Sequence, residues 1–260
     1  MQKRFRPIID AAQAGGAQAK KFFGREFTVS EKSKASDVCT AADLESEKAI
    51  LAVLDKYFAD YNVYSEEAGA VRNGSKRGTM YVDPLDGTNN FVLGIPYFST
   101  TITLVENDLT VFTVVYDPIM DLTYWAERGS GAFLGSKKLS VSTETDIERS
   151  TIAYAAGYTV PEKDMLAVIS RLKLRETKRV TTLWSPALDF CALAAGRIEV
   201  IVNQNDQLYD YLGGKLLCKE AGAVMSDFSG KLEQKEAEGN FVVSNRLEIH
   251  QEVIKVLGTT

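Results

Sequence analysis

The spacing of apolar residues predicts two helices near the start of the chain. Apolar positions recur at helical intervals over residues 8–23, despite Gly15 and Gly16 in the middle. They recur again after Thr40, which has the spacing of a capping box with Asp43. We expect the polar stretch VSEKSKASDVCT between the two helices to form an exposed loop or hairpin.

The middle of the chain is rich in β-branched and aromatic residues. These runs predict strands over residues 61–64, 80–82, 100–105, 111–116 and 122–126. Asn107 and Asp108 predict the turn between the runs 100–105 and 111–116. The following stretch, GSGAFLGSKKLSVS, predicts a hairpin punctuated by glycine.

Helices and strands alternate more clearly in the second half. Ser185 and Pro186 have the N-cap and first-turn preferences of a helix start, and Gly196 is suited to its end. Further elements are predicted as strands over 200–202 and 241–243, a helix over 211–221, and a final helix capped by Asn245. This mixture predicts a layered α/β (α+β) fold. We expect one domain over residues 1–260, with an N-terminal half of about 1–145 and a C-terminal half of about 146–260.

Composition and charge narrow the class of protein. The 260 residues are 45% hydrophobic and 25% charged, as in an ordinary globular protein, and the formal net charge is −5. That charge argues against a protein that binds nucleic acid by general electrostatics, so no nucleic-acid partner is expected. The N-terminus lacks the unbroken apolar run of a signal peptide, and no stretch is apolar enough to span a membrane. We therefore expect a cytoplasmic protein without a membrane partner.

Cysteine and histidine usage restricts the chemistry further. Three scattered cysteines are too few for a disulfide framework or a zinc cluster, and free thiols are expected. The single histidine, His250, is expected on the surface of the last helix. Catalysis by a Ser-His-Asp or Cys-His pair and histidine-rich metal sites are therefore disfavoured. Any catalysis would depend on carboxylates, hydroxyls, lysines or a bound metal.

The stretch YVDPLDGTNNF places two aspartates three residues apart at the end of a predicted strand. Pro84 fixes the backbone between them, and Gly87 permits a sharp turn or the close approach of a ligand. Asp83 and Asp86 could then face one space together with the Leu85 carbonyl. Two carboxylates so close repel each other unless one is protonated or a cation lies between them. Oxygen ligands without histidine favour Mg²⁺.

Each acidic position also has a simpler explanation. Aspartates in such a stretch commonly form Asx turns, and a Glu66–Glu67 pair is commonly a solvated loop. Asp43 and Asp210 are both suited to helix N-termini. The residues after Gly87 add a functional signal, because backbone N–H groups at a helix start can hold a phosphate.

Taken together, these residues resemble the inositol monophosphatase family of Mg²⁺-dependent, lithium-sensitive phosphatases. The first family motif is matched by DPLDGT at residues 83–88, with Asn90 and Phe91 following. The likeness covers nearly the whole chain. Its other matches are the Glu66–Glu67 pair, a loop lysine at Lys32 with Thr40 and Asp43, the glycine hairpin GSGAFLGSKKLSVS, and a looser second motif around Tyr209–Asp210 and Glu220–Ala223.

The resemblance implies an αβαβα sandwich, usually in a homodimer, and a role for each matched residue. Two or three Mg²⁺ ions would be held by Glu66, Asp83, the Leu85 carbonyl, Asp86 and Asp210. Asp43, Thr88 and Glu66 would orient and activate the attacking water. The backbone amides of Gly87 and Thr88 would hold the phosphate.

Departures from the family pattern bear on the substrate. Tyr209 replaces the usual tryptophan before the ligand Asp210, and Tyr211 and Leu212 replace small residues after it. Asn203 falls where inositol-specific members carry an acidic residue that touches the ring hydroxyls. Ser185 and Pro186 occupy a segment that normally lines the substrate pocket, so Ser185 and Asn203 are candidate substrate contacts.

The leading hypothesis is an Mg²⁺-dependent phosphomonoesterase acting on a small phosphorylated polyol or sugar, with inositol monophosphate first. Fructose 1,6-bisphosphate, histidinol phosphate and 3′-phosphoadenosine nucleotides are the alternatives within the same superfamily. Two hypotheses belong to other classes. One is a catalytically silent member that serves as a binding or regulatory module, and the other is a plain carboxylate-based protein that binds Ca²⁺ or another metal.

Overall fold

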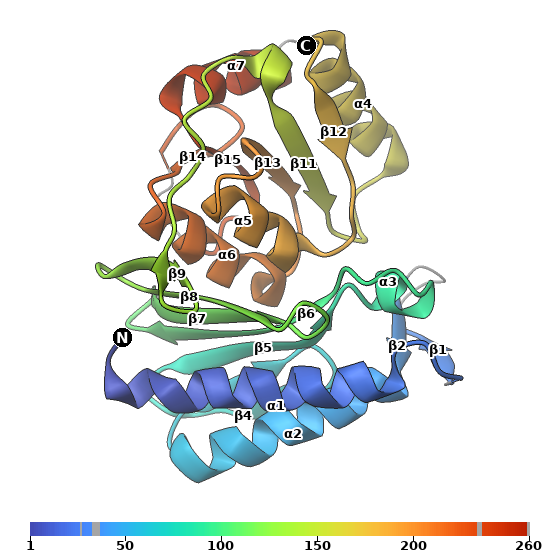
Figure 1. Ribbon diagram of the computed structural model, residues 1–260, viewed down its shortest axis with the longest axis vertical. Coiled ribbons are helices and arrows are strands. Elements are labelled where there is room, and N and C mark those ends of the chain that lie inside the picture. The colour runs from blue at the N-terminus through green and yellow to red at the C-terminus, as the bar shows by residue number, and fades with distance from the viewer. Residues whose placement is uncertain (27, 33–36, 233–235, 259–260) are drawn as a thin grey trace.

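The computed structural model describes the chain except residues 27, 33–36, 233–235 and 259–260. Its elements form five layers that alternate helix, sheet, helix, sheet and helix (Figure 1). The predicted αβαβα sandwich is therefore confirmed. From bottom to top in Figure 1, the helical layers are α1 (Arg6–Phe22) with α2 (Ala41–Tyr57), α5 (Pro186–Ala194) with α6 (Leu208–Glu220), and α4 (Glu162–Leu174) with α7 (Leu247–Gly258).

The larger sheet has eight strands in the order β10-β9-β8-β7-β6-β5-β3-β4. All neighbours pair antiparallel except β3 and β5, which are parallel. The strands are β3 (Asn62–Ser65), β4 (Gly69–Arg72), β5 (Thr79–Asp86), β6 (Ser99–Glu106), β7 (Leu109–Asp117), β8 (Leu122–Glu127), β9 (Gly131–Leu134) and β10 (Lys137–Lys138). The polar stretch before α2 forms a separate hairpin of β1 (Val29–Glu31) and β2 (Val38–Thr40).

The smaller sheet has five strands in the order β12-β11-β13-β15-β14. Here β11 pairs parallel with both β12 and β13, whereas β15 pairs antiparallel with β13 and β14. These strands are β11 (Thr151–Ala156), β12 (Arg179–Thr181), β13 (Val200–Gln204), β14 (Val224–Ser226) and β15 (Asn240–Ser244). A short helix, α3 (Thr88–Val92), follows β5 at one end of the larger sheet.

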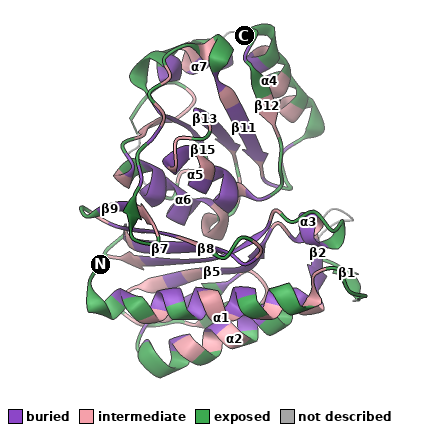
Figure 2. Cartoon of the chain, in the orientation of Figure 1, coloured by how far each residue is buried: buried purple, intermediate pink, exposed green. Residues whose placement is uncertain are grey.

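Apolar cores hold the layers together, and buried residues are concentrated in the two sheets and in α5 and α6 between them (Figure 2). The pair α1 and α2 packs on the outer face of the larger sheet. Gly15 and Gly16 permit that contact, because a Cβ would lie 2.6 Å from Ile50 Cγ1 and 2.6 Å from Tyr116 Cδ1, respectively. The glycines in the first predicted helix are therefore packing positions.

Two local predictions in the last part of the chain are wrong. His250 is buried, with Nε2 2.7 Å from the Ser226 hydroxyl and Nδ1 3.1 Å from that of Ser244. The apolar face of α7 packs on the smaller sheet and carries the ring inward. Asn245 lies two residues before α7, and its side-chain amide donates to the carbonyls of Ser142 and Glu144 instead of capping the helix.

Cys39, Cys191 and Cys218 are free and buried, as expected from their scatter. In the described part of the chain, every helix is too short or too polar to cross a membrane.

Candidate active site

A β-bulge at the end of β5 brings the two aspartates to one side of the strand. In a regular strand, residues three apart point to opposite faces. Here the pairing with β6 shifts between Asp83, opposite Thr101, and Asp86, opposite Ser99. The extra residue changes the alternation, so both carboxylates face the same space. Ser46 and Thr100 hold this geometry by donating hydrogen bonds of 2.8 and 3.0 Å to the Pro84 carbonyl.

Gly87 makes the turn from β5 into α3 in a left-handed conformation, with φ 96°. A side chain there would be strained, and its Cβ would lie 3.0 Å from the Tyr97 carbonyl. The turn places Thr88 at the start of α3. Its hydroxyl lies 2.9 Å from Asp43 Oδ1 and 3.0 Å from the Leu85 carbonyl oxygen. Asp43 has a second role at the start of α2. Its Oδ2 accepts the Thr40 backbone N–H, which forms the predicted capping box.

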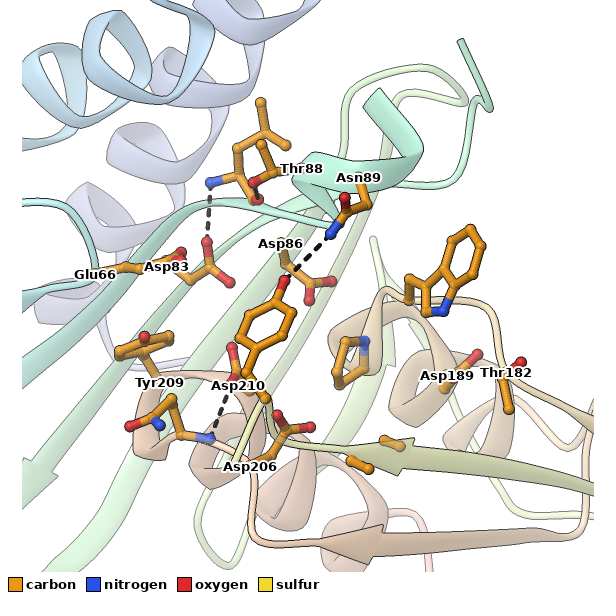
Figure 3. A pocket seen from close by; sticks show the side chains of 18 of the residues that line it. Glu66, Asp83, Asp86, Thr88, Asn89, Thr182, Asp189, Asp206, Tyr209 and Asp210 are labelled. Carbon is orange, nitrogen blue, oxygen red and sulfur yellow. Dashed lines mark hydrogen bonds between the residues drawn. The ribbon is translucent and has the colours of Figure 1, made fainter. Parts of the chain in front are cut away.

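The opposite wall is formed by the N-terminus of α6. Asp210 completes a capping box in which its Oδ2 accepts the Gln207 backbone N–H at 3.0 Å. Carboxylate oxygens of Asp83, Asp86 and Asp210 all lie within 4.8 Å of one another (Figure 3). Residues more than 120 positions apart in the chain thus converge, although each also has the local role that its sequence context suggests.

Glu66 approaches the cluster from the end of β3 (Figure 3). Its Oε1 accepts a 2.9 Å hydrogen bond from Lys32 Nζ, which also contacts Glu67 Oε1 at 2.5 Å. Lys32, which directly follows β1, therefore partly neutralises the acidic charge of Glu66 and Glu67. Lys34, the other lysine of that segment, lies outside the described residues.

Burial and mutual repulsion raise the pKa values of the converging carboxyls. Burial raises the pKa of Asp83 well above its usual range, and the charges of Glu66 and Asp86 add to this. The pKa of Asp210 is raised well above its usual range by burial and by Asp206. Burial likewise raises the pKa of Asp86 to about 7, against the opposing effect of its serine hydrogen bonds. Such a group of acids favours either bound protons or a bound cation.

A cavity of about 330 Å³ opens beside this cluster, between the ends of both sheets. Its described lining includes the predicted residues Glu66, Asp83, Leu85, Asp86, Gly87, Thr88 and Asp210. Aromatic walls are supplied by Tyr154, Tyr158, Trp184 and Tyr209. Tyr158 and Asn89 both line the cavity, and the Tyr158 hydroxyl accepts a 3.2 Å hydrogen bond from the Asn89 amide.

The two candidate substrate contacts lie behind the cavity wall. Ser185 occupies the predicted N-cap position of α5, but its fully buried hydroxyl donates to Asp86 Oδ2 instead of capping the helix. Ser99 donates to the same oxygen at 3.1 Å. Asn203 is 0% exposed, and its amide donates to the Gly239 carbonyl at 2.8 Å. Neither residue is part of the cavity lining, whereas Pro186, next to Ser185, is.

Two further carboxylates of the lining were not singled out in the sequence. Asp189 lies one turn into α5, and Asp206 lies just before α6. Asp189 follows Ser185 by four residues, so the predicted helix could have shown that both face the same side. Asp206 precedes Asp210 by four residues across an irregular segment, and no periodic signal marks it.

The donor set fits Mg²⁺. Asp206 Oδ2 is buried without a hydrogen-bond partner, and burial raises the pKa of Asp206 to about 6. The surrounding groups are carboxylate and carbonyl oxygens, the ligands that Mg²⁺ prefers. Among the described lining residues there is no lysine, arginine or histidine to neutralise them. A divalent cation would relieve the repulsion between the clustered carboxylates.

Known proteins resemble this chain in sequence and in fold. The sequence profile described as the inositol monophosphatase family matches residues 1–259. A Thermotoga maritima protein named fructose-1,6-bisphosphatase/inositol-1-monophosphatase is 35% identical over 90% of this chain and 88% of its own length. Nus factor SuhB of Pasteurella multocida is 31% identical over 86% of this chain and 84% of its own. The crystal structure of extragenic suppressor protein suhB from Bartonella henselae superposes with a TM-score of 0.91, at 29% identity and 98% coverage of both chains.

Both the profile and the Thermotoga maritima relative span most of the chain, including the β5 bulge and the start of α6 that build the acidic cluster. The sequence resemblance is thereby confirmed: this chain belongs to the inositol monophosphatase family.

Proposed function

We propose that this protein is an Mg²⁺-dependent phosphomonoesterase that hydrolyses a small phosphorylated polyol or sugar. The observation that carries the proposal is the convergence of Asp83, Asp86 and Asp210 within 4.8 Å beside a cavity of about 330 Å³. Hydrolysis of a phosphate ester requires charge neutralisation at the phosphate and a water aligned with the leaving oxygen. The cluster and its surroundings can provide for both requirements.

The metal would be held by side chains from both halves of the chain. We assign Glu66, Asp83, Asp86, Asp210 and the Leu85 carbonyl as the ligands of two or three Mg²⁺ ions. When bound, Mg²⁺ supplies charge neutralisation for the phosphate and lowers the pKa of water. Ser99 and Ser185 fix one oxygen of Asp86, which leaves its other oxygen directed at the cluster.

Thr88 and Asp43 are proposed to orient the attacking water. The Thr88 hydroxyl has one proton and two acceptors, Asp43 Oδ1 and the Leu85 carbonyl. When it donates to Asp43, its own lone pairs can accept a hydrogen bond from a water at the cavity wall. Burial raises the pKa of Asp43 to about 6, while its hydrogen bonds with Thr40 and Thr88 favour the charged form. Glu66 faces the same space and is the second group able to accept a proton from that water.

The phosphate would bind at the turn from β5 into α3. Gly87 has no side chain there, and the backbone N–H groups of Gly87 and Thr88 begin a helix. Amides in that position favour an anion. These two residues line the cavity next to the proposed metal ligands, so the phosphate would lie between the metal and the amides.

Inositol monophosphate is the first substrate to test, because inositol-1-monophosphatase is one of the two activities in the name of the Thermotoga maritima relative with 35% identity. A second candidate function is a non-catalytic binding role. It is favoured by the relatives named Nus factor SuhB. Against it, each proposed ligand position of this chain retains an oxygen donor of the expected kind.

Phosphate release from a substrate panel tests the proposal. The panel comprises inositol 1-phosphate, fructose 1,6-bisphosphate, histidinol phosphate and 3′-phosphoadenosine 5′-phosphate. Each substrate is assayed with Mg²⁺, with EDTA, and with Mg²⁺ plus Li⁺. We expect release that requires Mg²⁺ and is inhibited by Li⁺. No release from any substrate by protein that binds Mg²⁺ would favour the non-catalytic role. The predicted homodimer is tested by light scattering on the same preparation.

A further inference from the structure

We propose that Asp189 is a specificity residue that binds a hydrogen-bond donor on the leaving group and excludes substrates with a second phosphate. This inference rests on the proposed phosphatase function. It assigns the substrate class as monophosphate esters of alcohols that carry further hydroxyl or ammonium groups.

Asp189 is part of the cavity wall, and one of its two carboxylate oxygens accepts a hydrogen bond. The residue is 3% exposed and lines the cavity from α5 (Figure 3). Tyr97 donates a 2.8 Å hydrogen bond from its hydroxyl to Oδ1, which fixes the carboxyl group. Within the described part of the chain, Oδ2 accepts no hydrogen bond. Oδ2 is not among the fully buried polar atoms without a partner, so it is open to the cavity, where a substrate that supplies a donor is favoured over a substrate that cannot.

Asp189 is separate from the metal cluster. The carboxylate oxygens that converge within 4.8 Å belong to Asp83, Asp86 and Asp210, and Asp189 is not among them. A metal held by that cluster would bind the phosphate end of the substrate. Asp189 would therefore contact the alcohol end, in the same cavity.

Among its described residues, the rest of the cavity lining offers a second anion no cationic side chain. No lysine, arginine or histidine is found among the described lining residues. Beyond the proposed metal ligands, the charged groups of the lining are Asp189 and Asp206. Where Asp189 is ionised, a second phosphate near it would meet a negative charge in a buried environment, where repulsion between charges is strong. The structure thus favours one of the two activities in the name of the Thermotoga maritima relative, the monophosphatase, for this chain.

The remaining walls suit the ring or chain of such an alcohol. Tyr154, Tyr158 and Trp184 present aromatic faces, which pack on C–H groups and also attract an ammonium group. Hydroxyl and ammonium groups are both donors to Asp189. Substrates of each kind therefore form separate arms of the test.

The first test compares four substrates with the wild-type protein and Mg²⁺. Inositol 1-phosphate offers hydroxyl donors, histidinol phosphate an ammonium donor, phenyl phosphate neither, and fructose 1,6-bisphosphate a second phosphate. We expect kcat/KM for at least one donor substrate to exceed that for phenyl phosphate and for the bisphosphate by about 10-fold or more. The better donor substrate identifies hydroxyl or ammonium recognition.

The second test uses Asp189→Asn, which retains an oxygen acceptor for Tyr97, and Tyr97→Phe, which removes the group that positions Asp189. Asp189→Asn is expected to lower the kcat/KM ratio of the donor substrate to phenyl phosphate by about 10-fold or more, and Tyr97→Phe by less. Glu162→Gln removes an exposed acid outside the lining and serves as the matched charge control. That control is expected to keep the wild-type ratio.

The outcomes separate the two proposals. A wild-type preference for the bisphosphate would overturn the inference, as would an unchanged substrate ratio in folded Asp189→Asn protein. Both results leave the phosphatase function in place, because release is still observed. Absence of Mg²⁺-dependent release from all four substrates, phenyl phosphate included, would instead overturn the proposed function and the specificity role with it.

Discussion

At the scale of single residues, the site is a group of acids held close together by neighbouring donors. Ser99 and Ser185 donate to Asp86, Tyr97 donates to Asp189, and backbone N–H groups donate to Asp83 and Asp210. These hydrogen bonds fix each carboxyl group, but they leave the repulsion between the carboxyls in place. Removing one charge should therefore affect metal binding and the stability of the metal-free protein in opposite directions.

Asp86→Asn tests this balance. The amide keeps the shape of the side chain and an oxygen acceptor for the two serines, but it loses the charge that would bind Mg²⁺. We expect turnover of inositol 1-phosphate to fall at least about 100-fold. The thermal unfolding midpoint in EDTA should equal or exceed that of wild type. Wild-type turnover in this variant would show that Asp86 is not a metal ligand.

The stability contribution of Asp189 should depend on pH. Burial raises its pKa to about 7 in the folded protein, whereas the unfolded chain has an ordinary carboxyl pKa of about 3.8. Between these two pKa values, Asp189 therefore holds a proton in the folded state that it has released in the unfolded state. This contribution is fully present below about pH 3.8 and is lost as pH rises through about 7.

Urea unfolding of wild type and Asp189→Asn at pH 5 and pH 8.5 measures the effect. The wild-type free energy of unfolding should fall more than that of the variant between these values, by more than about 1 kcal/mol. Equal changes in the two proteins would contradict the raised pKa.

At the scale of secondary-structure elements, two features build the site: the bulge of β5 and the close packing of α6. Gly213 of α6 faces the hydroxyls of Thr103 and Thr113 on the larger sheet, and Gly214 faces the Phe190 ring of α5. A Cβ at either glycine would overlap these groups. Because these two positions have no side chain, the helix that carries Asp210 can pack closely against both the larger sheet and α5.

Gly214→Ala should destabilise the protein, although alanine is the better helix former. Phe190 is fully buried and cannot move away, so overpacking should cost about 1–3 kcal/mol of unfolding free energy. Gly258→Ala is the control, because a Cβ there would meet no atom within 4 Å. Chemical denaturation compares the two variants, and an equal effect of both would refute the packing argument.

The sequence predicted elements with strong local signals and missed those without them. The Asn107–Asp108 turn, the capping box of Thr40 and the start of α5 at Pro186 are all present. The segment that forms β11, α4 and β12 received no prediction. β11 is a short strand buried among other elements, and α4 begins after Pro161 without a side-chain cap. Asn245 was misassigned because a carbonyl-binding amide and a helix cap have the same residue preference.

The sequence predicted the acidic cluster of the candidate site better than it predicted the substrate contacts. Residue spacing indicated Asp83 and Asp86, the family resemblance added Asp210, and the structure brings the three together. The sequence could not indicate that Asn203 is buried outside the cavity lining or that Asp189 is part of that lining, because both positions depend on how the layers pack. Local sequence carries little information about such long-range contacts.

At the scale of the whole molecule, the site joins the two parts of the sandwich. Asp83 and Asp86 extend from the larger sheet, and Asp210 extends from the helical layer between the sheets (Figures 1 and 3). A metal bound to all three would link layers that are otherwise held by apolar cores. Metal binding should therefore stabilise the molecule as well as activate it.

Thermal unfolding at increasing Mg²⁺ concentration measures this linkage. Mg²⁺ at about 100 times its dissociation constant should add about 2.7 kcal/mol to the free energy of unfolding. Asp210→Asn should lose most of this gain, because its ligand from α6 is removed. An equal gain in Asp210→Asn and wild type would place the stabilising metal elsewhere.

We propose above that this acidic cluster binds Mg²⁺ for phosphate-ester hydrolysis. The most direct test of this proposal is the rate of phosphate release from inositol 1-phosphate as Mg²⁺ is added back to EDTA-treated wild-type protein. We predict no release before addition, followed by a saturable rise as the ion is restored. If the protein releases phosphate at the same rate before and after Mg²⁺ is added, hydrolysis does not depend on Mg²⁺ and the proposed function is wrong.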